Sequence, residues 1–214
     1  MASEAIRNPQ TDHLITPENS ALLIIDYQPV QVSSIRSMPR EELVFNITGV
    51  AKAAINYGVP VVHSTVNVAS GRNKPPIRGL QDVLGHLPTY DRTTINAWED
   101  VDLKQAVKAL GRRKLIMTAL WTEVCLTFPA LDALLEGFEV YVPVDAVGGT
   151  SVAAHDAGLR RVEQAGGKMT SRVQLYCELQ RDWTREATIP GFMDVFESYD
   201  GFNPEKAAAA AAAA

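Results

Sequence analysis

The chain has 214 residues, of which 46% are hydrophobic and 21% charged, and its formal net charge is −5. This length and composition predict one globular domain over residues 1–206. The acidic balance, without a concentrated basic stripe, argues against nucleic acid or an anionic membrane as partners. The eight alanines at 207–214 are expected to be an artefact or an unassigned tail outside the fold.

The first residues, MASEAIRNPQTDHL, lack the apolar core of a signal peptide. No window approaches the ~20 apolar residues that a membrane span needs. We therefore expect a cytoplasmic protein, in which a reducing environment argues against a disulfide between Cys125 and Cys177. Neither cysteine has a CxxC partner, so a thiolate metal cluster is also excluded.

Apolar runs alternate with helical patterns along the chain, a pattern that is typical of an α/β fold with a parallel sheet and helices on both faces. A long irregular segment, 68–88, has the length of a functional lid or a partner contact. Glycines 58, 111 and 137 follow three of the predicted helices and suit left-handed C-caps. The expected strands are 21–26, 60–65, 114–120, 138–144 and 168–173, and the expected helices are 40–57, 101–110, 122–136 and 151–165.

Ligands bind outside the carboxyl ends of strands in open parallel sheets. Cys125 follows one such strand end, three residues after Thr122, which can cap the next helix. A first-turn position favours thiolate over thiol, although an isolated cysteine can equally be a small buried hydrophobe. Pro129 cannot donate a helical hydrogen bond to the Cys125 carbonyl, so the first turn must kink or find another donor. Cys177 is expected to be buried in a C-terminal helix.

Asp26 ends the first apolar strand, where it could cap the next loop or act as a general base toward Cys125. Gln28 could orient that carboxylate or contact a substrate. Arg92 could be a solvated surface residue. If it points into the cleft, its fixed cation would favour both carboxylate and thiolate, but its pKa is too high for it to shuttle protons.

Three segments, IIDYQ, the basic residue ahead of INAW, and WTEVC, together resemble the isochorismatase-like cysteine hydrolase superfamily, in particular its YcaC-type subgroup. The resemblance covers roughly residues 20–183. It implies a three-layer α/β/α sandwich with a six-stranded parallel sheet and a catalytic triad. Carried over by position, the triad is Asp26, Arg92 and Cys125.

The resemblance also implies a cis peptide between Trp121 and Thr122, and backbone N–H groups of this turn that hold an oxyanion. Gln28, His63 and Asn96 are the candidate substrate-pocket residues, with His63 expected as a satisfied polar residue of the pocket wall. Most members of the superfamily have lysine where this chain has Arg92. Metal-dependent members use an Asp and two His after the second strand, but that spacing is missing here. We therefore expect no metal and no cofactor.

These features predict a hydrolase that cleaves an amide-type C–N bond of a small carbonyl substrate through a thioacyl enzyme, with Asp26 as base. The alternative is a homo-oligomeric scaffold or a thiol redox sensor with little turnover. The resemblance implies a closed homo-oligomer, and an octamer is the form it suggests.

Overall fold

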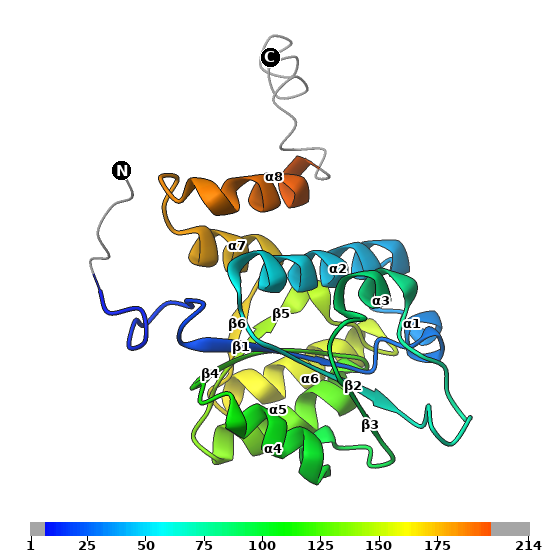
Figure 1. Cartoon of the computed structure of the whole chain (residues 1–214). Helices are drawn as coiled ribbons and strands as arrows, with labels where there is room; N and C mark the ends of the chain where they lie inside the picture. Colours follow the sequence, from blue (N-terminus) through cyan, green and yellow to red (C-terminus); the bar gives the residue numbers. More distant parts are fainter. Residues whose placement is uncertain (1–6, 198–214) are drawn as a thin grey trace.

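The structure is a computed structural model that describes residues 7–197, so the alanine tail and the last residues of the expected domain lie outside the described residues. Six parallel strands form one sheet in the order β3-β2-β1-β4-β5-β6. Helices cover both faces of the sheet (Figure 1). The expected three-layer α/β/α architecture with a six-stranded parallel sheet is confirmed.

Five of the six strands are predicted from the sequence, with ends that differ by at most three residues. The exception is β3, a four-residue edge strand with only one buried position, which has too little apolar pattern to be recognised. Strand β6 is shorter than expected because Ser171 caps α7 by accepting a hydrogen bond from the Gln174 N–H. The strands are β1 (Ser20–Ile25), β2 (Val61–Val66), β3 (Thr89–Arg92), β4 (Lys114–Ala119), β5 (Glu139–Pro143) and β6 (Lys168–Thr170).

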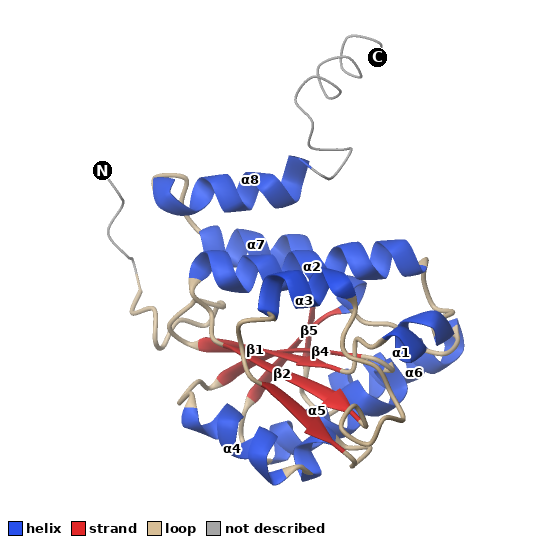
Figure 2. Cartoon of the chain, turned by 45° about the vertical axis from the view of Figure 1, so that its right-hand side comes forward, coloured by secondary structure: helices blue, strands red, loops and turns tan. Residues whose placement is uncertain are grey.

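The helices form two layers, with the sheet between them (Figure 2). One face carries α2 (Arg40–Tyr57), α3 (Arg78–Leu84) and α7 (Arg172–Gln180), with α8 (Ile189–Glu197) outside α2 and α7. The other face carries α4 (Val101–Ala109), α5 (Thr127–Leu135) and α6 (Val152–Gln164). The short helix α1 (Pro29–Ser34) follows the carboxyl end of β1. Helix α2 has the predicted bounds, and Gly58, with a φ of 69°, is its predicted left-handed C-cap.

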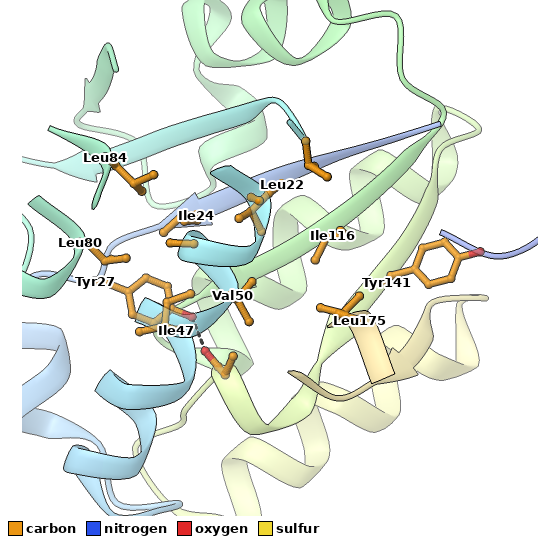
Figure 3. Close-up of a cluster of buried hydrophobic side chains, with 14 of the residues drawn as sticks. Leu22, Ile24, Tyr27, Ile47, Val50, Leu80, Leu84, Ile116, Tyr141 and Leu175 are labelled. Atoms are coloured by element: carbon orange, nitrogen blue, oxygen red, sulfur yellow. Dashed lines mark hydrogen bonds between the residues drawn. The ribbon is translucent and has the colours of Figure 1, made fainter. Parts of the chain in front are cut away.

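The core is divided by the sheet because side chains of a strand alternate between its faces. All six residues of β1 are buried. Leu22 and Ile24 pack in the cluster under α2, while Leu23 and Ile25 pack in the cluster toward α4 and α5. Figure 3 shows the first cluster, in which the Tyr27 hydroxyl donates a hydrogen bond of 2.6 Å to the Ala146 carbonyl.

The strand order also locates a binding region. From β1 the chain builds outward through β2 to β3, and then returns to place β4 on the other side of β1. The carboxyl ends of β1 and β4 therefore flank the topological switch point, where ligands bind in open α/β sheets. Asp26 follows β1 and Cys125 follows β4 at this point.

Candidate active site

Asp26 and Arg92 form a buried, bidentate ion pair at the switch point. The two contacts, Nη1 to Oδ1 and Nη2 to Oδ2, are both 2.7 Å, and both side chains are 0% exposed. Asp26 has a φ of 64°, an uncommon backbone conformation for a residue other than glycine. The two residues come from strands that are not neighbours, because β2 lies between β1 and β3.

Arg92 is fixed by more than the carboxylate. Its Nη1 also donates to the Ser64 hydroxyl and the Thr65 carbonyl, both at 3.1 Å, and its Nη2 donates to the Ile95 carbonyl at 3.2 Å. Burial acts to lower the pKa of Arg92, but the hydrogen bonds with Asp26 and its charge outweigh burial and raise that pKa. The guanidinium is therefore a permanent cation of the site and not a solvated surface group.

Cys125 is buried, with 8% of its surface exposed, and it is charge-coupled to both residues. Burial, followed by the charge of Asp26 and its hydrogen bond with the thiol, raises the pKa of Cys125 to about 12, while Arg92 and the Trp121 N–H act to lower it. The prediction that its position favours a resting thiolate is therefore wrong. The Asp26 and Arg92 side chains have no exposed surface, and Cys125 is the most exposed of these three residues.

The turn that carries Cys125 is a π-helix, Thr122–Leu126, and not the first turn of one helix over 122–136. Its defining contact is a hydrogen bond of 3.2 Å from the Leu126 N–H to the Trp121 carbonyl. Helix α5 begins afresh at Thr127, so Pro129 lies in its first turn, where a helix needs no N–H donor. The expected disturbance of the helix is resolved as this π-turn, a feature that is common at functional sites.

Three expectations about Thr122 are wrong. Trp121, not Thr122, is the N-cap residue, and the cis peptide lies one bond earlier than expected, between Leu120 and Trp121. The Thr122 N–H donates to the Gly148 carbonyl at 2.9 Å, so it is not available to hold an oxyanion. The Trp121 indole N–H donates to the Ser34 hydroxyl at 2.6 Å, which ties the turn to α1.

Gln28 is brought close to the site but serves the loop that follows β2. Its side-chain amide donates to the carbonyls of Val66 and Lys74, and its oxygen accepts from the Val66 N–H at 3.0 Å. The side chain is fully buried. Gln28 therefore holds the start and end of segment 67–74 together, and nothing in its contacts orients the Asp26 carboxylate.

His63 lies on the opposite face of the sheet from Arg92. It pairs in register with Ile24, which belongs to the cluster under α2, whereas the next residue, Ser64, contacts Arg92. Burial lowers the pKa of His63 to about 4, and its Nε2 has no hydrogen-bond partner among residues 7–197. It is a neutral core histidine, and the expectation that it is a satisfied residue of the pocket wall is wrong.

Asn96 lies a few residues after Arg92 and has a structural set of contacts. Its oxygen accepts from the Trp98 N–H at 3.0 Å, and its Nδ2 donates to Asp132 at 2.7 Å. It therefore caps the short 3-10 helix Ala97–Glu99 and connects it to α5.

Cys177 lies in helix α7, as expected, but the prediction that it is buried is wrong, because the residue is exposed.

The site uses residues that the sequence did not single out for it. The Ser64 hydroxyl accepts a hydrogen bond from the Arg92 guanidinium, and the Gly148 carbonyl accepts one from the Thr122 N–H. Side chains alternate along the strand VVHSTV, which places Ser64 on the opposite face of the sheet from His63. The sequence does not predict strand β3, however, so it gives no reason to place Arg92 beside Ser64. Gly148 comes from the segment that follows β5, and no local sequence pattern relates it to Cys125.

Neither a metal centre nor a membrane span is found among residues 7–197. No group of three or more His, Cys, Asp or Glu side chains is arranged to hold a metal ion there. No helix in the described part of the chain is long and apolar enough to cross a membrane.

An acid, a fixed cation and a thiol at the switch point of an all-parallel sheet define an α/β enzyme site with a cysteine as its candidate nucleophile. Residues 20–174 match the isochorismatase domain model. The chain belongs to the isochorismatase family of hydrolases.

YcaC of Escherichia coli is similar to this chain over most of its length, in sequence and in structure. The chain is 32% identical to the probable hydrolase YcaC of Escherichia coli K12, over 88% of this chain and 95% of that one. A structure of YcaC from Escherichia coli, described as an octameric hydrolase of unknown specificity, is 30% identical and matches 90% of this chain and 98% of its own with a TM-score of 0.78.

A structure of YcaC from Pseudomonas aeruginosa, with hexane-2,5-diol and covalent acrylamide, is 32% identical with a TM-score of 0.83. The match covers 94% of this chain and 98% of that one. Nicotinamidase PncA from Bacillus subtilis, at 17% identity and a TM-score of 0.60 over 72% of this chain and 99% of its own, shares the fold alone.

Proposed function

We propose that this protein is a cysteine hydrolase that cleaves an amide-type C–N bond of a small carbonyl substrate, with Asp26 as base. The observation that carries the proposal is the Asp26 carboxylate, which is held by Arg92 and interacts with the Cys125 thiol. A thiol with a raised pKa needs such a base to become a nucleophile at neutral pH.

In the first half-reaction, the Asp26 carboxylate accepts the thiol proton while the sulfur attacks the carbonyl carbon. The N–H groups of Trp121 and Cys125 replace that of Thr122 as the candidate oxyanion donors, because the Trp121 N–H already faces the sulfur. Collapse of the tetrahedral intermediate breaks the C–N bond, and the protonated Asp26 returns its proton to the departing amine. A thioester on Cys125 remains.

In the second half-reaction, Asp26 accepts a proton from water as the water oxygen attacks the thioester. Collapse releases the carboxylic acid, and the proton returns from Asp26 to the sulfur. Arg92 cannot carry protons in either step, since its pKa is too high. Its role is to hold the Asp26 carboxylate in place, aimed at the sulfur.

The redox-sensor alternative is less well supported. Sensor cysteines are exposed and have a low pKa, whereas Cys125 is 8% exposed and its pKa is raised to about 12. A homo-oligomer is compatible with either function, and the octameric relative from E. coli supports a closed homo-oligomer for this chain too. Exposed apolar side chains near the carboxyl edge, Val30, Ile95 and Val152, are candidates for the contact.

Mass spectrometry with a panel of small amides and esters tests the mechanism. We expect an acyl adduct on Cys125 that is absent in Cys125→Ala and strongly reduced in Asp26→Asn, with Cys177→Ala as the matched cysteine control. Covalent acrylamide in the Pseudomonas structure supports small amide-containing electrophiles as first probes. Turnover that survives Cys125→Ala, or a broad panel that yields neither adduct nor product, would refute the proposal.

A further inference from the structure

The π-turn that carries Cys125 rests directly on one face of α6. His155 and Gly158 lie three residues apart, and therefore on the same face of that helix. A Cβ at Gly158 would come within 2.9 Å of the Glu123 Cα and 3.1 Å of the Thr122 carbonyl carbon. The backbone of the turn and the backbone of α6 thus approach as closely as a glycine allows.

One side-chain contact crosses this junction at the residue that begins the turn. The Thr122 Oγ1 lies 2.8 Å from the His155 Nδ1. The other polar atoms of Thr122 are also engaged, since its N–H donates to Gly148 and its carbonyl accepts from the Thr127 hydroxyl at 2.7 Å. Thr122 is therefore fixed at every polar atom, and His155 is the titratable partner.

Thr122 is next to Trp121, whose N–H faces the Cys125 sulfur and whose carbonyl accepts from Leu126 to close the π-turn. A rotation at Thr122 would therefore move the N–H that stabilises the thiolate. Displacements of about 1 Å at a reacting group can cost a hundredfold in rate.

We propose that His155 is a positioning residue, which acts through the Thr122 hydroxyl to hold the Cys125 turn in its reactive geometry. A role of His155 in hydrolysis rests on the proposed function, but its effect on the reactivity of the Cys125 thiol does not. The charged groups that influence His155 are Asp156 and Glu123, and burial outweighs both of them and lowers its pKa. The ring is thus neutral at neutral pH and keeps one nitrogen as an acceptor.

Two substitutions at His155, to asparagine and to leucine, distinguish this positioning role from simple packing. The side-chain amide of asparagine can place a polar atom near the position of the Nδ1, whereas leucine fills the space without a hydrogen bond. Thr122→Val removes the hydroxyl and nearly preserves the shape. His86, an exposed histidine outside the site, provides His86→Leu as the matched control.

The experiment measures the rate of Cys125 alkylation by iodoacetamide, in a Cys177→Ser background, by intact-protein mass at several pH values. We expect His155→Leu to slow alkylation at least about tenfold. His155→Asn and His86→Leu should stay close to the parent rate. The double variant His155→Leu/Thr122→Val should be no slower than the slower single variant, because both remove one interaction.

The inference is overturned if His155→Leu remains folded and alkylates at the parent rate, or if His155→Asn loses as much as His155→Leu. Urea unfolding of each variant detects a purely structural role, in which stability falls while the alkylation rate does not. No substrate is used, so a failure of the hydrolase proposal leaves this readout unaffected. Where a substrate is found, the same variants should lower kcat with little change in KM.

Discussion

Arg92, at the end of a strand two places away in the sheet, donates hydrogen bonds of 2.7 Å to both carboxylate oxygens of Asp26. Neither side chain has any exposed surface. A lysine could contact this carboxylate only as a point charge, without the planar fork. An arginine here cannot transfer protons, but it fixes the direction in which the carboxylate points. In the proposed mechanism, Asp26 carries the proton and Arg92 determines where Asp26 points.

The strength of this pair can be measured with a double-mutant cycle. Arg92→Met leaves a buried carboxylate without its partner and should lower the free energy of unfolding by about 3–5 kcal/mol. Adding Asp26→Asn should recover part of that loss, since the second variant removes the stranded charge. Urea denaturation of the parent, both single variants and the double variant gives the coupling. Strict additivity of the two losses would contradict the contact.

The pH dependence of Cys125 follows from its raised pKa. The neutral thiol is the favoured form below about pH 12, and the thiolate fraction rises tenfold per pH unit below that value. In Cys177→Ser protein, iodoacetamide alkylation of Cys125 should therefore keep rising from pH 7 to pH 10. A plateau below pH 8 would mean that a stable thiolate already exists in the resting site.

Gln28 should control the order of the loop after β2. Gln28→Leu keeps the volume but removes three hydrogen bonds to Val66 and Lys74, and it leaves these part-buried backbone groups without the Gln28 side chain as partner. We expect faster hydrogen exchange over segment 67–74 and a loss of about 1–3 kcal/mol in the free energy of unfolding. Gln105→Leu, at an exposed position of α4, is the control. Unchanged exchange in this segment would show that Gln28 does not hold it.

Gly158 should tolerate no larger residue. Alanine normally favours a helix, but here its Cβ would meet the backbone of Glu123 at 2.9 and 3.1 Å. Gly158→Ala should therefore destabilise the protein by about 1–3 kcal/mol and slow Cys125 alkylation. Glu163→Ala, exposed on the same helix, should do neither. A Gly158→Ala protein that is more stable than the parent, by calorimetry, would indicate that α6 can move away freely.

The sequence predicts much of the fold because periodicity and end signals agree over the long elements. Helix α2 begins and ends at the predicted residues, with Gly58 as its cap. Strand β3 was missed because an edge strand of four residues buries too little to leave a pattern. Helices α1 and α3 were not predicted either, and α3 lies within the segment that was expected to be irregular.

The site was predictable in its members but not in its electrostatics. Asp26 and Cys125 stand out because each follows a strand end, and Arg92 gained weight only through the family resemblance. The expectation for Cys125 followed from position alone, whereas its pKa is set mainly by burial, which is a property of the packed structure. His63 was misplaced for a similar reason, since the face of β2 that it occupies depends on the register with β1.

The position of Arg92 makes the site sensitive to the edge of the sheet. Strand β3 is held on one side only, through its pairing with β2, and Arg92 is its last residue. Edge elements with few buried contacts open at lower free energy than the core around β1 and β4. A local detachment of four residues would thus remove the cation from Asp26 while the rest of the fold stays intact. The local stability of strand β3, and not only that of the whole fold, therefore determines how often the ion pair between Asp26 and Arg92 is complete.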